Sequence, residues 1–218
     1  DRPIAWQLLK YGLIASVTTF FTSLVLISIR GQINSLSSSV EAGCWSAMNS
    51  LTDRMNSILF STVVVYYIPK LSSLIAPDSL VTEMLKAFKR ILPLTFVLVF
   101  GVWLCKDLII KILLDDEFVP MRDLFLFQML GLFFKAGAML FSFLAISKAM
   151  LKTALIVELL YAATMWVTHF ICIKEFGWIG ASYGFAIANL LYFLYYIISF
   201  RNMVVLIKKK LAPNPWLK

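Results

Sequence analysis

Long uncharged apolar runs dominate this sequence, and the clearest extends over residues 11–29, between Lys10 and Arg30. At 1.5 Å per residue, a helix of this length spans about 28 Å, close to the ~30 Å hydrocarbon core of a bilayer. Similar runs follow, and the predicted membrane-spanning segments are residues 11–29, 43–68, 91–114, 124–147, 153–173 and 180–200. The sequence therefore predicts an all-α integral membrane protein with six transmembrane helices, a single six-span unit covering residues 1–218.

The composition supports this class. Hydrophobic residues make up 61% and charged residues 15% of the 218 residues, whereas soluble domains have about 45–50% and about 25%. The net charge of +8 does not indicate nucleic acid as a partner, because the basic residues lie between apolar runs and not along one face. The chain begins at Asp1, without an initiator Met or a signal peptide, so we expect a fragment or a processed piece.

The distribution of Lys and Arg predicts the orientation in the membrane. Basic residues concentrate near both ends of the chain, in the segment 70–90 and in the turn at 147–152, and they are fewer in the alternate loops. With six spans, all of these basic segments lie on one side. By the positive-inside rule, both termini are predicted to be cytoplasmic.

The segment between the second and third spans has a pattern of its own. Pro69 is expected to stop or kink the second span. Residues 79–90 place apolar side chains on one helical face and charged ones elsewhere, which predicts a short helix lying at the membrane surface. The alternative is a linker helix packed on neighbouring spans.

The second span carries a polar stripe. At 100° per residue, its serines, asparagines and charged side chains share one arc of the helix, while Met and Leu side chains take the other. An ionisable group deep in a bilayer costs at least about 2.5 kcal/mol and normally faces a partner or water. We favour a water-filled cavity; the alternative is that Asp53 and Arg54 lie near a helix end or neutralise groups on other helices. The candidate pathway residues on this span are Asn49, Asp53, Arg54, Asn56 and Ser57.

Lys135 is the second candidate, near the middle of the fourth span and about 17 Å from either end. Its stem is too short to reach the interface. It must contact water in a cavity or pair, with Asp53 or Glu158 as the candidates. Glu158 has an alternative structural role within reach of Lys148 or Lys152. His169, toward the far end of the fifth span, is expected as a polar side chain at the interface.

Enzyme activity is not indicated. The chain has one histidine, no nucleotide-binding Gly-rich loop after a strand and no H-E-x-x-H motif. Its three cysteines lie far apart in separate hydrophobic segments, so we expect neither a disulfide framework nor a metal site, and no cofactor. Charged groups at depth in a helical bundle predict a permeation or flipping site.

Several motifs resemble one family of transporters. Residues 43–53 (GCWSAMNSLTD) and 65–71 (VYYIPKL) are similar to the eighth span of Wzx-type polysaccharide flippases. Residues 118–125 (FVPMRDLF) and 143–149 (FLAISKA) resemble the tenth and eleventh spans of the O-antigen and enterobacterial-common-antigen lipid translocases. Further matching positions are Gln128, Gly131, Lys135, Glu158, His169 and the turn 177–181 (GWIGA).

The resemblance implies an architecture and an activity. Such proteins belong to the multidrug/oligosaccharidyl-lipid/polysaccharide exporter superfamily, with twelve spans in two six-helix lobes, and this chain would be the second lobe. The missing partner would be the N-terminal six-span half. The family moves undecaprenyl-pyrophosphate-linked oligosaccharide from the cytoplasmic to the periplasmic leaflet of the bacterial inner membrane by alternating access, driven by ion or proton gradients.

The resemblance also suggests roles for the candidate residues. Lys135 and Arg54 would contact the pyrophosphate-sugar head group, and Asp53 or Glu158 would titrate during the cycle. Arg54 stands where the family has a neutral residue, so its role rests on burial physics alone. Asn49, Asn56 and the serines would line the path of the glycan.

Two other functions remain open. A drug or cation exporter of the same superfamily would favour acidic cavity groups and aromatic contacts. A non-transporting scaffold, for example in a complex with a polysaccharide polymerase, would bury the polar stripe against another protein. Labelling of the stripe by a water-soluble thiol reagent separates a cavity from a scaffold.

Overall fold

The computed structural model describes residues 2–74, 76–148 and 150–211. In this part of the chain every regular element is a helix. The elements are α1 (Arg2–Leu36), α2 (Ser39–Ser73), α3 (Pro77–Leu104), α4 (Lys106–Leu113), the 3₁₀ helix η1 (Asp116–Leu124), α5 (Phe125–Ser147), α6 (Leu151–Phe176), the 3₁₀ turn η2 (Gly177–Ile179) and α7 (Gly180–Leu211). The predicted all-α class is confirmed. Asp1 and residues 212–218 of the expected unit lie outside the described residues.

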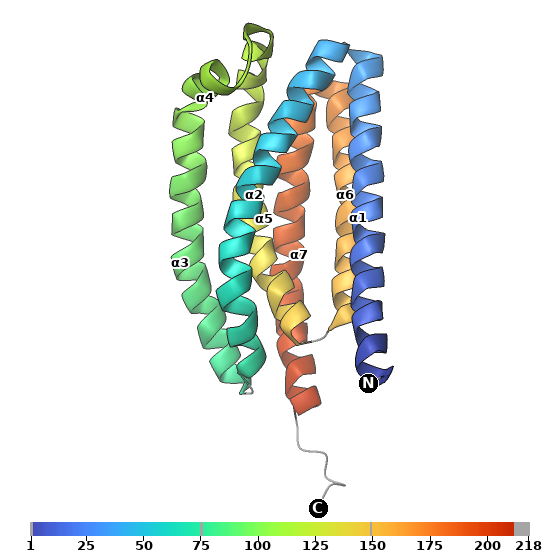
Figure 1. Ribbon diagram of the computed structural model, residues 1–218, viewed down its shortest axis with the longest axis vertical. Helices are drawn as coiled ribbons and strands as arrows, with labels where there is room; N and C mark the ends of the chain where they lie inside the picture. Colours follow the sequence, from blue (N-terminus) through green and yellow to red (C-terminus); the bar gives the residue numbers. More distant parts are fainter. Residues whose placement is uncertain (1, 75, 149, 212–218) are drawn as a thin grey trace, which may run out of the picture.

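The long helices lie side by side along the long axis of the molecule (Figure 1). Helix α7 packs most extensively on α5 and α6, α1 flanks α6, and both α2 and α3 pack on α5. The first residues of α1, the α2–α3 turn, the α5–α6 connection and the end of α7 lie at one end of the bundle (Figure 1). The α1–α2 turn, α4, η1 and the α6–α7 turn lie at the other. Asp53 and Lys135, near the middle of α2 and α5, are therefore remote from both ends, whereas Glu158 lies about two turns after the start of α6.

Four segments are long and apolar enough to cross a membrane: Ser16–Leu36, Ser79–Leu104, Asp116–Ser147 and Thr153–Phe200, the last of which contains most of α6 and α7. Large apolar side chains are exposed along them, and Ile27 and Ile198 are 68% and 74% exposed. Hydrocarbon surroundings account for such surfaces. The chain is an integral membrane protein, and its number of crossings stays a prediction because α2 is not among these segments.

The region after α2 differs from the sequence expectation. Helix α2 continues through Pro69 to Ser73, and residues 79–90 are the first part of α3 and not a separate surface helix. The physical reason is packing, because Leu80, Met84 and Ala87 are buried on one face of this segment. The expected third span ends at Leu104, where Cys105 interrupts the helix before α4.

Glycines bring the central helices into close contact. A side chain at Gly184 would place its Cβ 2.7 Å from the Cα of His169, and one at Gly180 would overlap the carbonyl of Cys172. The hydroxyl of Thr168 donates to the carbonyl oxygen of Gly184 at 3.0 Å. Small residues allow such backbone approach between membrane helices. Helices α6 and α7 therefore hold their side chains in a fixed register.

Candidate functional site

Charged side chains on three helices interact electrostatically. Lys135 on α5 is partly buried, and the charges of Asp53 on α2 and Glu158 on α6 both act on its ammonium group. In residues 2–74, 76–148 and 150–211, Lys135 forms no ion pair within 4.0 Å. The charges of both carboxylates therefore act on the ammonium group, which forms no close ion pair with either one. We call Asp53, Lys135 and Glu158 the charged cluster.

The α2 side of the cluster is a short hydrogen-bonded stripe. The Asn49 side-chain amide donates to Oδ2 of Asp53 at 3.1 Å, and the Ser57 hydroxyl donates to the backbone carbonyl of Asp53 at 2.8 Å. Asn49, Asp53 and Ser57 are spaced by four residues, so they lie on one face of α2. The side chains of Asp53 and Ser57 are exposed in this chain, and Asn49 is partly covered.

Two residues of the predicted stripe are not brought to the cluster. Arg54 is exposed, and its charge is not among those that act on Lys135. Asn56 is partly buried, and its side-chain oxygen has no hydrogen-bond partner in the part of the chain that the structure describes. Consecutive residues of a helix point about 100° apart, which separates Arg54 from Asp53.

The partner of Glu158 is a tyrosine. The hydroxyl of Tyr192 on α7 donates to Oε1 of Glu158 at 2.6 Å. Of the two partners expected from the sequence, Lys148 donates from its ammonium group to the carbonyl oxygen of Leu74 at 2.6 Å, and the side chain of Lys152 lies outside the described residues. Glu158 is therefore held by α7, inside the bundle.

A second hydrogen-bonded pair extends this polar region and was missed in the sequence. Tyr161 donates to the side-chain oxygen of Asn189 at 3.0 Å, and Asn189 donates to the carbonyl oxygen of Phe185 at 2.8 Å. The rings of Tyr161 and Tyr192 are 4.3 Å apart. The available signal was spacing, because Tyr161 lies three residues after Glu158 and Tyr192 three after Asn189, each pair on one helical face.

His169 is buried and not at the interface as expected. Its side chain is 1% exposed and lies against Gly184. The Nδ1 atom is 2.7 Å from the carbonyl oxygen of Met165, and Nε2 has no partner among the described residues. The close approach of α6 and α7 covers this position.

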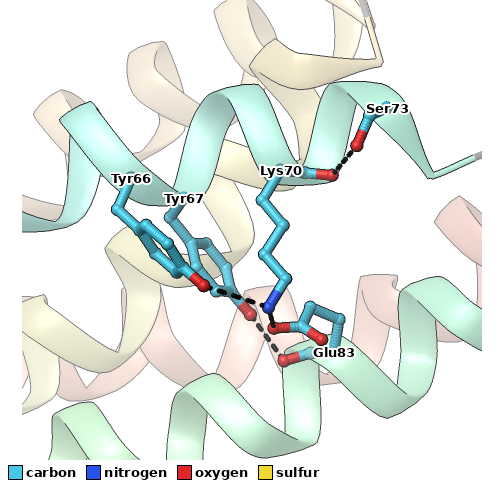
Figure 2. A network of polar contacts seen from close by, with 5 residues as sticks. All are labelled: Tyr66, Tyr67, Lys70, Ser73 and Glu83. Carbon is cyan, nitrogen blue, oxygen red and sulfur yellow. Dashed lines mark hydrogen bonds and ion pairs between the residues drawn. The ribbon is translucent and has the colours of Figure 1, made fainter.

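A separate polar contact joins α2 to α3 (Figure 2). The Lys70 ammonium lies 2.5 Å from Oε1 of Glu83, and the Tyr67 hydroxyl donates to the carbonyl oxygen of Glu83 at 2.6 Å. Lys70 also donates to the Tyr66 hydroxyl at 3.4 Å. The hydrogen bond with Glu83 raises the pKa of Lys70 above its ordinary value of 10.5. This contact lies near the end of the bundle where α2 turns into α3 (Figure 1).

The described residues do not bring three or more His, Cys, Asp or Glu side chains together in a way that could hold a metal ion. The three cysteines are free thiols, with Cys44 and Cys172 buried and Cys105 exposed.

Comparison with known proteins gives two relatives, from Escherichia coli (strain K12) and Shigella flexneri. Each is 31% identical to this chain over 193 residues, which is 88% of this chain and 46% of the relative. Both are named Lipid III flippase. The chain therefore spans about half the length of the curated relatives it matches. No family model and no solved structure matches the chain.

The relatives are thus transporters and not enzymes, because a flippase moves a lipid between the two leaflets of a membrane. This agrees with the helical membrane architecture and with the charged cluster inside the bundle.

Proposed function

We propose that this chain is part of a flippase that moves a lipid-linked oligosaccharide across the bacterial inner membrane. The observation that carries the proposal is Lys135, a partly buried ammonium group near the middle of α5 on which the charges of Asp53 and Glu158 act, and which forms an ion pair with neither. A buried cation that only fixed the fold would be expected in a close pair. The similarity to Lipid III flippases supplies the class of cargo.

In the finer proposal, the cargo is an undecaprenyl-pyrophosphate-linked oligosaccharide such as an O-antigen repeat, moved outward by alternating access. The chain forms one six-helix lobe of a twelve-helix transporter and is completed by an N-terminal lobe. The length of the relatives, about twice that of the matched region, supports this arrangement. Because α1 begins and α7 ends at one end of the bundle, we propose from the positive-inside rule that both termini are cytoplasmic.

The cargo has three chemically distinct parts, and the described residues suit two of them. Asn49, Ser57 and the unpaired side-chain oxygen of Asn56 offer hydrogen bonds to sugar hydroxyl groups. Lys135 offers a cation to the pyrophosphate, and the exposed Arg54 offers a second from a neighbouring direction. The hydrocarbon tail stays among membrane lipids along the apolar outer surface.

We further propose that transport is linked to protonation of a carboxylate in the charged cluster. While Asp53 and Glu158 are both ionised, they compete with a phosphate for Lys135. Uptake of a proton by Glu158 or Asp53 removes one competing charge, so the ammonium group binds an anion more strongly. Loss of that proton restores the competition and favours release of the cargo, so the protonation state of a carboxylate and the affinity of Lys135 for an anion are linked. The tyrosine on Glu158 can accept a hydrogen bond after protonation as readily as it donates one before.

One observation favours a second candidate function. The cluster contains two carboxylates and one lysine, with Tyr161 and Tyr192 beside it. Acidic groups and aromatic rings suit an organic cation. A drug or cation exporter of the same superfamily is therefore the alternative.

The test is transport by the complete protein that carries this chain, reconstituted in vesicles. We expect Lys135→Ala and Asp53→Asn to reduce flipping of a lipid-linked oligosaccharide at least about tenfold, as for loss of a charged contact of about 1.4 kcal/mol or more. Lys111→Ala, on the exposed side of α4, is the matched control and should transport normally. Unchanged flipping in both cluster variants contradicts the proposal, and uptake of organic cations in place of the lipid favours the alternative.

A further inference from the structure

A pocket separate from the charged cluster lies between α2 and α3. It has a volume of about 250 Å³, and its walls include Val63 and Tyr66 from α2 and Ala87, Arg90 and Ile91 from α3. Tyr66 lies thirteen residues beyond Asp53, or about 20 Å along α2. Glu83 and Tyr67, shown in Figure 2, form the side of the pocket that faces the α2–α3 turn.

Arg90 is the uncompensated charge of this pocket. Glu83 is neutralised by Lys70 at 2.5 Å. Arg90, in contrast, has an exposed side chain and forms no ion pair or hydrogen bond with another described residue. Its positive charge acts electrostatically on the Tyr67 hydroxyl group. The pocket therefore presents one free guanidinium group, which can bind two oxygens of a phosphate at once.

Tyr66 provides a second polar group at the same opening. Its hydroxyl oxygen accepts a hydrogen bond from Lys70, so its own hydrogen remains to be donated. Val63, Ala87 and Ile91 supply an apolar lining, and Ala87 is buried. A small polar opening above apolar walls suits a head group with an attached hydrocarbon chain.

The position along α3 suits a lipid head group. Arg90 lies fourteen residues before Leu104, or about 21 Å along the helix. With Leu104 at one boundary of a hydrocarbon core about 30 Å thick, Arg90 lies about 9 Å from the other boundary, within reach of the head groups through its flexible stem. Leu94, one turn further into the core, is 61% exposed, as expected for contact with lipid tails.

We propose that the pocket between α2 and α3 binds the phosphodiester head group of an anionic phospholipid. Arg90 pairs with the phosphate, Tyr66 donates a hydrogen bond to it, and the first carbons of an acyl chain lie along Val63 and Ile91. Basic pockets between transmembrane helices bind anionic lipids in this way. The proposal concerns a bound membrane lipid and does not depend on the cargo that the protein moves.

The test compares Arg90→Gln with Lys89→Gln, which removes the same charge from the adjacent exposed position outside the pocket. The chain is purified from vesicles containing phosphatidylglycerol and phosphatidylcholine, and the retained lipid is counted by native mass spectrometry. We expect the unmodified chain and Lys89→Gln to retain phosphatidylglycerol preferentially. Arg90→Gln should retain it at least about tenfold less.

Three results would overturn the proposal. Equal loss in both variants would indicate diffuse attraction to the basic surface. Displacement of the lipid by inorganic phosphate would indicate a site for the free anion. Absence of retained phosphatidylglycerol on the unmodified chain would indicate no lipid site. Arg90→Lys, which keeps the charge but not the paired contact, should retain an intermediate amount, and circular dichroism shows whether each variant folds.

Discussion

The Tyr192 hydroxyl on α7 donates a 2.6 Å hydrogen bond to the Glu158 carboxylate on α6. The bond joins two helices whose backbones already touch near Gly184, and it fixes the direction in which one carboxylate of the charged cluster points. The charge of Glu158, held in this direction, acts on Lys135 on α5.

Replacing Tyr192 by Phe should both destabilise the bundle and impair transport. The change leaves Glu158 without its hydrogen-bond donor, and a hydrogen bond to a charged group contributes about 1.5–3 kcal/mol. Thermal unfolding of the purified chain measures the loss of stability, and the vesicle assay measures transport by the complete protein. Tyr195→Phe removes a hydroxyl from a neighbouring, more exposed ring and should change neither. If both variants lost stability and transport equally, the loss could not be attributed to the hydrogen bond between Tyr192 and Glu158.

Replacing Gly184 by Ala should destabilise the α6–α7 contact. The added Cβ would lie 2.7 Å from the Cα of His169, a backbone atom that cannot move aside. Overpacking of this kind costs about 1–3 kcal/mol. Gly101→Ala on α3 is the control, since a Cβ there meets nothing within 4 Å. A Gly184→Ala chain that unfolds at the same temperature as the Gly101→Ala chain would show that the helices separate easily.

The contact between Lys70 and Glu83 predicts a dependence on alkaline pH. Because the hydrogen bond to Glu83 raises the pKa of Lys70 above 10.5, the charged lysine is favoured in the folded state. Its stabilising effect is complete below the unfolded pKa and is lost as the pH rises through the folded pKa. Lys70→Gln should therefore unfold at a lower temperature than the unmodified chain at about pH 9. Above about pH 11 the two unfolding temperatures should become equal.

Two controls belong to this pH series. Lys86→Gln, an exposed lysine on α3, should show no difference at either pH. The arginine of Lys70→Arg stays charged over the whole pH range of the experiment. This variant should therefore remain stable at high pH, where the unmodified chain loses the contribution of the charged lysine. If Lys70→Gln unfolded at the same number of degrees below the unmodified chain even at high pH, the hydrocarbon part of the lysine side chain, and not its charge, would stabilise the packing of α2 on α3.

Water along α2 is testable by cysteine labelling in the complete protein, after Cys105, the exposed native thiol, is replaced by Ser. Cysteines at Asn49, Asp53 and Ser57 should react with a water-soluble thiol reagent, because these positions lie on the polar face that leads to Lys135. A cysteine at Ile58, which is 62% exposed beside the stripe, should react less because it faces lipid. Protection of all three stripe positions would indicate that another protein covers this face.

The sequence was sufficient for the helical class, and for Lys135 it predicted contact with water or with an acidic partner. Both follow from local rules: uncharged runs must be helical in lipid, and an ammonium group at depth in a bilayer needs water or opposite charge nearby. The sequence alone could not choose between Asp53 and Glu158, and the structure places both close enough to act on Lys135.

The errors arose where the choice depends on tertiary packing. Residues 79–90 are amphipathic, and an apolar face can lie on lipid or on protein; the buried Leu80 and Met84 show that here it lies on protein. The contact between Tyr192 and Glu158 was not predicted, because it depends on the alignment of α6 and α7, which the periodicity of either helix does not define. His169 is buried for the same reason.

The backbone contacts at Gly180 and Gly184 have a mechanical consequence. Helices locked at such short separation cannot slide past each other, so α6 and α7 must move as a rigid pair and carry Glu158 and Tyr192 with them. Helices α2 and α3, by contrast, are joined near one end through Lys70 and Glu83. A shift of α2 relative to α5 would therefore change the separation of Asp53 from Lys135, while Glu158 and Tyr192 kept their contact.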